Sequence, residues 1–93
     1  MNNQSVINAF ICGKSANSSN RNLRSYGNKL VSYYTTIAER LADGTIILNR
    51  TKYSVSTSKI QTYILKDVLN NKLNHKEVYN VPLGASDLAK YIR

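Results

Sequence analysis

The sequence predicts an α+β fold: a three- or four-stranded, mainly antiparallel sheet with an N-terminal helix and a principal helix in the C-terminal half. Three observations support this prediction. β-Branched and aromatic residues alternate over residues 31–38, Asp43-Gly44 separates two apolar runs, and apolar residues recur with helical spacing after residue 59. With 93 residues and a mass of 10.5 kDa, the chain is expected to form a single domain, residues 1–93.

The first element is expected to be a short helix that ends near Gly13, although a first strand is the competing interpretation. Residues 14–22 are rich in Ser and Asn and show no period, so a loop is expected there. The apolar residues that would share one side of the helix are Val6, Ile7, Phe10 and Ile11.

The sheet is expected to span about residues 23–56. A Gly-Asn pair at residues 27–28 predicts a tight turn, which leads into one long strand over residues 31–38. Tyr33 and Tyr34 are adjacent in this strand, so only one of them can face the core. The other tyrosine is therefore a candidate contact residue.

The next part of the sheet is expected to be a hairpin. Asp43-Gly44 is a pair that a type I′ turn favours, and the following run at residues 46–48 is apolar at every position. This run predicts a strand that is covered on both faces. Alternation over residues 51–55 then predicts further extended structure.

The principal helix is expected over about residues 59–70, where Ser58 and Gln61 would form a capping box. A short extended segment would follow, and Pro82 would confine it to a sheet edge. Ser86 would then cap a last short helix.

The charge balance of the chain indicates an anionic partner. Lys and Arg number 13 against 5 Asp and Glu, a formal charge of +8, and the first carboxylate is Glu39. A single cysteine, Cys12, allows no internal disulfide, and the longest strongly apolar run, residues 46–48, is far too short for a membrane span. We therefore expect an intracellular protein with no membrane partner.

Residues suited to catalysis are few. His75, the one histidine, lies between Asn74 and Lys76 in what reads as a polar loop, which disfavours a catalytic base. Three carboxylates could in principle hold a magnesium ion, but their local contexts argue for other roles, and no glycine-rich phosphate loop is present. We therefore expect no enzyme, cofactor or metal, with a metal-dependent nuclease as the third choice. The three carboxylates are Asp67, Glu77 and Asp87.

One candidate anion site lies where the extended segment is expected to pass into the principal helix. Alternation would place Lys52, Ser54 and Ser56 on one strand face, and the strand would deliver Ser58 and Lys59 to the helix N-terminus. Free amides and the helix dipole attract anions there. In the simpler alternative Ser58 only caps the helix and Lys52 only solubilises an exposed face.

Cations also interleave with tyrosines between residues 21 and 53, a pattern typical of single-strand binders, in which Lys and Arg neutralise phosphates and Tyr stacks on bases. The alternative is a sheet whose tyrosines pack in the core while its cations face water. The full set of candidate contact residues for nucleic acid or another partner is Arg21, Arg24, Lys29, Tyr34, Arg50, Lys52, Ser58 and Lys59.

The central segment also resembles a known domain. Residues 32–58, SYYTTIAERLADGTIILNRTKYSVSTS, with the upstream pieces INAF, GKSA and NLRSYGNKL, resemble a small domain of unknown function that many bacteriophage genomes encode. The shared features are a Gly-Asn turn, a TxIAER strand, a Gly turn and an NxTKYSVSTSK passage. The resemblance covers about two thirds of the chain and implies a phage-type accessory protein that acts in the host cytoplasm.

Two functional hypotheses follow from the charge and from this resemblance. In the first, the protein binds nucleic acid, or a complex that contains it, through a cationic face. In the second, it inhibits a host defence nucleoprotein by protein-protein binding, in the manner of an anti-CRISPR protein, a step that is analogy by genomic company. An exposed sheet edge and a modest core also allow a homodimer.

Overall fold

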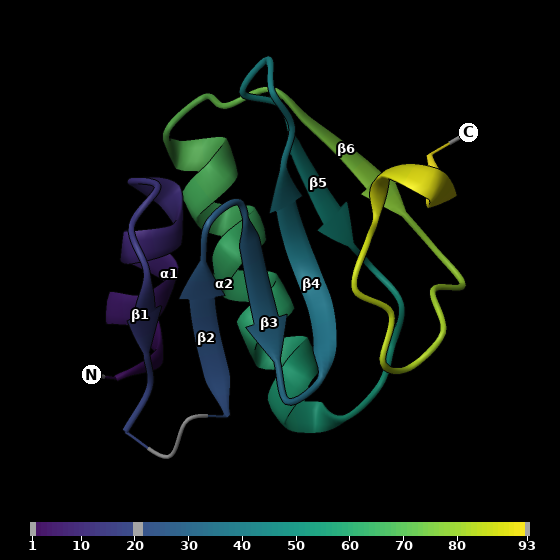
Figure 1. Cartoon of the computed structure of the whole chain (residues 1–93), viewed down its shortest axis with the longest axis horizontal. Helices are drawn as coiled ribbons and strands as arrows, with labels where there is room; N and C mark the ends of the chain where they lie inside the picture. The colour runs from purple at the N-terminus through teal and green to yellow at the C-terminus, as the bar shows by residue number, and fades with distance from the viewer. Residues whose placement is uncertain (1, 20–21, 93) are drawn as a thin grey trace.

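The computed structural model describes residues 2–19 and 22–92, which form one sheet with two helices on one of its faces (Figure 1). Strands β1 to β5 are antiparallel neighbours in chain order, and β6 is added parallel to β5. The elements are α1 (Asn3–Ile11), β1 (Ala16–Asn17), β2 (Leu23–Tyr26), β3 (Lys29–Ser32), β4 (Thr35–Arg40), β5 (Ile46–Asn49), α2 (Val55–Asn70), β6 (His75–Val78) and a 3₁₀ turn (Ala89–Tyr91).

The α+β class and both helices agree with the prediction, but the predicted strand number is wrong. The described residues form six strands rather than three or four, and the sheet is mixed. The sixth strand follows from α2, which carries the chain back over the sheet so that β6 enters beside β5 in the same direction, as in a strand-helix-strand crossover. β1 arises within the predicted loop, and the extended segment predicted over residues 51–55 is not a strand.

The predicted long strand over residues 31–38 is divided by a turn at Tyr33-Tyr34. Ser32 pairs with Thr35, so β3 and β4 form a hairpin with two tyrosines at its tip. Both rings are largely outside the core, with 46% of Tyr33 and 84% of Tyr34 exposed, so the expectation that one would be buried is wrong. Tyr33 has φ 57, a conformation that a bulky residue rarely adopts.

The hairpin predicted at Asp43-Gly44 is present between β4 and β5, but the turn type differs. Gly44 has φ 91, whereas Asp43 does not have the positive φ that a type I′ turn requires. The Asp43 carboxylate instead accepts a hydrogen bond of 2.9 Å from the backbone N–H of Thr45. Closure of this turn therefore depends on the carboxylate as well as on the glycine.

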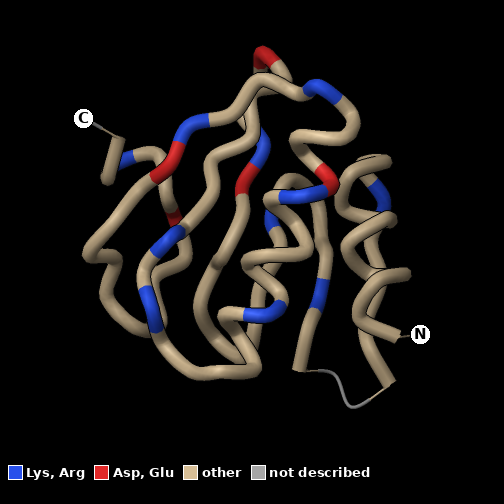
Figure 2. The backbone as a smooth tube through the Cα atoms, turned by 180° about the vertical axis from the view of Figure 1, so that it is seen from behind, with Lys and Arg blue, Asp and Glu red and all other residues tan. Residues whose placement is uncertain are grey.

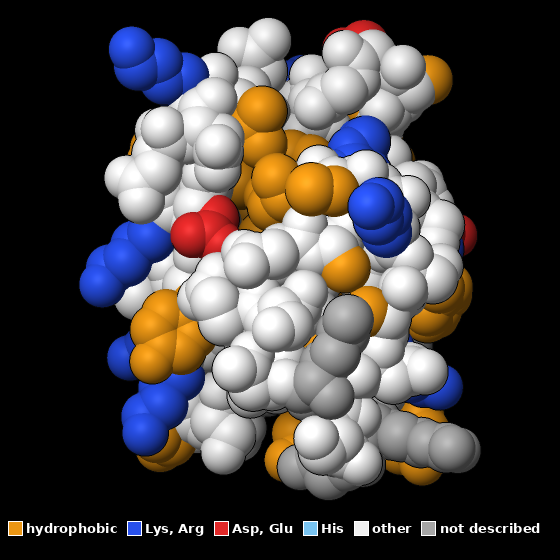
Figure 3. Space-filling model, turned by 90° about the vertical axis from the view of Figure 1, so that its left-hand side faces the viewer, with side chains coloured by type: hydrophobic (Ala, Val, Ile, Leu, Met, Phe, Trp, Pro, Cys, Tyr) orange, Lys and Arg blue, Asp and Glu red, His pale blue; other side chains and the backbone are white. Residues whose placement is uncertain are grey.

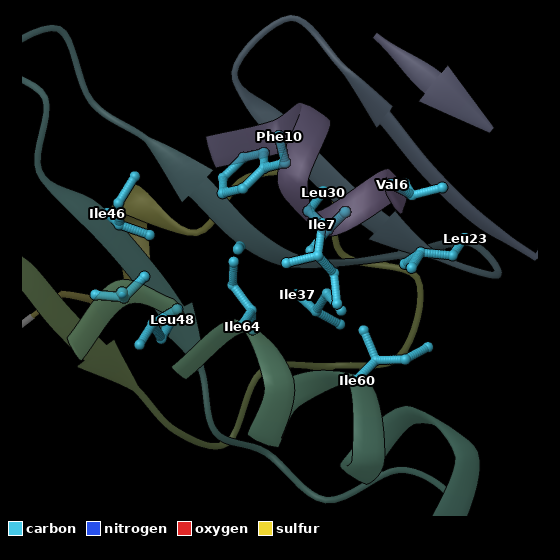
Figure 4. Close-up of a cluster of buried hydrophobic side chains, with 12 residues drawn as sticks. Val6, Ile7, Phe10, Leu23, Leu30, Ile37, Ile46, Leu48, Ile60 and Ile64 are labelled. Carbon is cyan, nitrogen blue, oxygen red and sulfur yellow. The ribbon is translucent and has the colours of Figure 1, made fainter. Parts of the chain in front are cut away.

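The main hydrophobic core fills the space between the two helices and the sheet (Figure 4). A second, smaller cluster lies on the opposite face of the sheet, beneath the C-terminal segment, and contains Ile47, Val78, Val81 and Leu88. Ile46 and Leu48 belong to the main core while Ile47 belongs to the second cluster, which confirms the prediction that this strand is covered on both faces. The main core contains Val6, Ile7, Phe10, Leu23, Leu30, Ile37, Ala38, Ile46, Leu48, Ile60, Ile64 and Val68.

Helix α1 ends where the sequence predicts. Gly13 has φ 77 and its N–H donates to the carbonyl of Phe10, while the N–H of Lys14 donates to Ala9, which is the Schellman arrangement. The Arg40 guanidinium from β4 also donates to the carbonyls of Phe10 and Ile11. This side chain joins the end of α1 to the sheet.

Helix α2 begins four residues before the predicted start, because Ser54 rather than Ser58 is the N-cap. The Ser54 hydroxyl accepts from the N–H of Thr57 at 3.2 Å. Ser58 already lies inside the helix and its N–H donates to the Ser54 carbonyl. The predicted Ser58-Gln61 capping box is therefore wrong.

The C-terminal segment also differs from the prediction. Pro82 lies in a loop outside the edge strand β6, and Ser86 does not cap a helix, because the short 3₁₀ turn begins without a side-chain cap. The carbonyl of Ser86 instead accepts from the hydroxyl of Thr36 at 2.8 Å. The N–H of Leu88 donates to the Glu39 carboxylate at 3.1 Å. These bonds hold the segment on the second face of the sheet.

A buried polar network fixes the connection from β5 to α2. The side-chain amide of Asn49, which is 1% exposed, donates to the carbonyl of Thr36 at 3.1 Å and to the hydroxyl of Tyr53 at 2.9 Å. The Tyr53 hydroxyl donates to the carbonyl of Val81 at 2.7 Å. From α2, Gln61 donates to the carbonyl of Asn49 at 2.6 Å and to that of Thr51 at 2.9 Å.

We predict that Asn49→Ala lowers the free energy of unfolding by about 2–4 kcal/mol, because it leaves several buried polar groups without partners. Tyr53→Phe removes one hydroxyl and should cost about 1–2 kcal/mol. Urea denaturation followed by circular dichroism measures both values. Asn70→Ala, at the exposed end of α2, is the control and should change stability by less than about 0.5 kcal/mol. Equal effects of Asn49→Ala and Asn70→Ala would contradict the role of the network.

Candidate functional site

The surface around the beginning of α2 contains two adjoining hollows. The first, which we call the lysine hollow, has a volume of about 640 Å³ and carries Lys52 and Lys59 in its wall. Lys52 comes from the loop before α2, and Lys59 from the second turn of the helix. The lining residues are Lys52, Tyr53, Ser54, Val55, Ser58, Lys59, Thr62 and Tyr63.

The second hollow, which we call the tyrosine hollow, has a volume of about 650 Å³ and shares Tyr53 and Ser54 with the first. The exposed rings of Tyr33 and Tyr34 reach it from the β3–β4 turn, and Leu83, which is 78% exposed, reaches it from the C-terminal segment. Its lining residues are Ser32, Tyr33, Tyr34, Thr35, Tyr53, Ser54, Ser56, Thr57, Leu83 and Gly84.

The outer face of α2 continues the positive charge away from the lysine hollow. Lys59, Tyr63 and Lys66 are spaced four and three residues apart, which places them on one side of the helix, and both lysines are exposed. Residues 50–72 contain five Lys and Arg and one carboxylate. Figure 2, seen from the helix side, shows this distribution along α2 and its flanks, and Figure 3 shows Lys and Arg gathered along the edge that carries α2.

Local electrostatics at this surface favour anions. The first turn of α2 contains no acidic residue, so the partial positive charge of its N-terminus is not offset from within that turn. Asp67, the carboxylate of the region, accepts a hydrogen bond of 2.8 Å from Gln4 of α1. Arg50 lies 3.5 Å from the Glu77 carboxylate of β6, which offsets part of its charge. The lysines therefore supply most of the field.

The fold brings together only part of the predicted contact set. Lys52, Ser58 and Lys59 line the lysine hollow, and Arg50 lies beside Lys52 and Ser58 in a smaller recess of about 150 Å³. Tyr34 lines the adjoining tyrosine hollow. These five residues gather around the beginning of α2.

The other predicted cations lie elsewhere. Arg24 and Lys29 are on the sheet face opposite the helices, since their neighbours Leu23 and Leu30 point into the main core. The Arg24 guanidinium lies 6.0 Å from the centre of the Tyr26 ring. Arg21 lies outside the described residues.

Lys29 forms an ion pair with Asp87 of the C-terminal segment, at 2.7 Å. The hydrogen bond from Lys29 lowers the pKa of the Asp87 carboxyl, and the bond to Asp87 raises the pKa of Lys29. Lys29 therefore helps to hold the C-terminal segment on the sheet, and its charge is already matched.

The residues of the lysine hollow converge for a different reason from the predicted one. Alternation along a strand was expected to place Lys52, Ser54 and Ser56 on one face, but residues 51–54 are a loop and Ser56 is in the helix. Ser58 and Lys59 reach the same place because α2 begins at Val55 and its first two turns face the loop.

Several residues of this surface escaped the sequence prediction. The helical spacing after residue 59 groups Tyr63 with Ile60, Ile64 and Val68 on the apolar face, but Tyr63 is exposed at the margin of that face. Lys66 has a detectable signal, since it continues the helical spacing from Lys59 on the polar side. Tyr33 enters the sequence prediction only as one of two alternatives with Tyr34, because nothing in its local sequence marks a turn that contains a positive φ and exposes both rings. Leu83 is brought close only by the path of the C-terminal segment.

The carboxylates proposed for a metal are separated. Asp67 bonds to Gln4, Glu77 pairs with Arg50, and Asp87 pairs with Lys29. No group of three His, Cys, Asp or Glu within the described residues could hold a metal ion. His75 begins strand β6 and is partly buried, so the expectation of a polar loop at this position is wrong.

Within residues 2–19 and 22–92, neither helix has the length and apolar character needed to cross a bilayer.

Comparisons with family models, with curated proteins and with solved structures find no match to this chain. The site is therefore interpreted from its own geometry and charge.

The Lys29–Asp87 pair gives a pH prediction. The hydrogen bond from Lys29 lowers the pKa of the Asp87 carboxyl in the folded protein. The contribution of the ion pair to stability is therefore fully present above the unfolded pKa and is lost as the pH falls through the folded pKa. We expect Asp87→Asn at about pH 6, where the wild-type carboxylate is charged, to increase amide hydrogen exchange of residues 81–92 about two- to threefold and to leave α2 unchanged. Ser86→Asn is the control, because Ser86 bonds to Thr36 through its backbone carbonyl. Unchanged exchange in Asp87→Asn would show that the pair does not hold the segment.

Proposed function

We propose that this protein is a phage-type accessory protein that acts in the host cytoplasm, without a catalytic role, and binds nucleic acid or a complex that contains it. The observation that carries the proposal is the outer face of α2, where Tyr63 lies between Lys59 and Lys66 and leads to Lys52 in the lysine hollow. Lysines on such a surface neutralise phosphates, and an exposed ring offers a face on which a base can stack.

The dimensions of α2 support the proposal. Lys59 and Lys66 are seven residues apart, about 10 Å along the helix axis. Their long, flexible side chains can reach phosphates a few nucleotides apart on one strand. Lys52 and Arg50, whose charge Glu77 partly offsets, extend the positive charge beyond the first turn of the helix, so at most about four cations are available to one bound strand.

Salt dependence tests this function. If four phosphates of a single strand are neutralised, raising the salt from about 50 to about 200 mM should weaken binding roughly fiftyfold, as counterion release requires. We expect Lys59→Gln/Lys66→Gln to weaken binding at about 50 mM and to reduce the slope of log affinity against log salt by about 1.4. Fluorescence polarisation with labelled single-stranded DNA, single-stranded RNA and a duplex measures these values.

The matched control is Lys76→Gln/Lys90→Gln, which removes the same charge at exposed positions away from α2. Lys76 pairs with Ile47, whose side chain belongs to the second cluster, and Lys90 is in the C-terminal 3₁₀ turn. This variant should retain most of the wild-type slope. A flat salt response of the wild-type protein, or equal losses in the two double variants, would reject the proposed surface.

A second candidate function is inhibition of a host defence nucleoprotein by protein-protein binding, in the manner of an anti-CRISPR protein. The observation that favours it is the tyrosine hollow, whose lining contains no charged residue and includes the exposed Tyr34 and Leu83. Exposed aromatic and aliphatic side chains of this kind are typical of protein contact surfaces.

This second candidate predicts that tagged protein from phage-infected cells retains a host protein after nuclease treatment. Tyr34→Ser should reduce that capture, whereas Tyr79→Ser, at an exposed tyrosine outside both hollows, should not. Capture of nuclease-sensitive material alone would exclude the candidate.

A further inference from the structure

We infer that the tyrosine hollow holds an unpaired base of a single-stranded nucleic acid, while the lysine hollow beside it holds the adjoining phosphate. This inference rests on the proposed nucleic-acid binding and adds the part of the ligand that is recognised. It makes the beginning of α2 a site for exposed nucleotides rather than a general anion surface.

The shape of the tyrosine hollow suits a flat ligand. Its volume of about 650 Å³ is within the range of small-molecule sites and is ample for one base and its sugar. Tyr33 and Tyr34 offer exposed rings from the β3–β4 turn, and Leu83 approaches from the C-terminal segment. Stacking on aromatic rings is the principal way in which proteins hold unpaired bases without strong sequence preference.

The division of charge between the two hollows matches the division within a nucleotide. No Lys, Arg, Asp or Glu lines the tyrosine hollow, as suits a neutral base. The lysine hollow contains Lys52 and Lys59 and no carboxylate, as suits a phosphate. Tyr53 and Ser54 belong to both walls, so the two parts of one ligand would lie on either side of them.

The conformation of Tyr33 adds support. Its φ of 57 is a conformation that a bulky residue adopts less readily than glycine, and the ring is about half exposed. A turn alone would be satisfied better by Gly or Asn. The aromatic ring at this position is therefore explained better by a contact that the ring makes with a partner than by the needs of the turn.

The experiment compares two labelled single strands of about 12 nucleotides with the same number of phosphates, one with bases and one abasic, and a duplex. The wild-type protein should bind the strand with bases roughly tenfold more tightly than the abasic strand, because stacking is lost in the latter. The duplex should bind more weakly than the single strand with bases, since its bases are already stacked and paired.

Tyr34→Ser should lose most of the preference for bases and leave the abasic affinity unchanged. Tyr33→Asn should do the same, and since Asn tolerates a positive φ, this variant retains the turn. Tyr79→Ser is the matched control for an exposed tyrosine and should keep the wild-type preference. Circular dichroism confirms that each variant is folded.

The outcomes separate this inference from the proposed function. Equal binding of the two single strands, with a loss in Lys59→Gln/Lys66→Gln, would overturn the inference and leave the proposed function standing. Equal weakening of both strands by Tyr34→Ser would also overturn it. Failure of every probe to bind at about 50 mM salt would reject both.

Discussion

The hydrogen bonds of Asn49 are the constraint on which the rest of the molecule depends. This one side chain, at the end of β5, joins β4 through Thr36 and the C-terminal segment through Tyr53 and Val81. Gln61 brings α2 to the same point by bonding the Asn49 carbonyl. Because buried amides and hydroxyls are costly to leave unsatisfied, these elements can occupy only one arrangement. Both hollows are built on that arrangement.

The same constraint explains why the exposed aromatic and cationic residues meet at one end of the fold. The turn at Tyr33-Tyr34, the loop that contains Lys52 and the beginning of α2 are adjacent because β3, β4 and β5 are neighbouring strands. Tyr53 fixes the loop from within, so the residues on either side of it face outward. A hydrogen-bonded polar interior thus supports an exposed surface, as is common for binding sites carried on loops.

Prediction from sequence succeeded where one physical signal determined the outcome. The apolar spacing of α1 and the unbroken apolar run of β5 report burial directly, and both were predicted correctly. It failed where two local signals competed: Ser54 and Ser58 are both acceptable caps, and in the structure Ser54 caps the helix while Gln61 bonds to the carbonyls of Asn49 and Thr51. The parallel β6 and the turn at Tyr33 depend on contacts distant in sequence. The local sequence pattern therefore does not predict the parallel strand β6 or the turn at Tyr33.

The net charge of the chain follows from its composition, but the positions of the charged side chains on the folded surface could not be predicted from the sequence. Lys29 is matched by Asp87 across 58 residues, and the C-terminal segment covers the second face of the sheet with Ile47, Val81 and Leu88 beneath it. The part of that face beneath the C-terminal segment is therefore buried, and the charge of Lys29 there is matched. Residues 50–72 have a different balance, since they contain five Lys and Arg and one carboxylate. The fold consequently places a group of exposed lysines on the side where α2 and the two hollows are accessible.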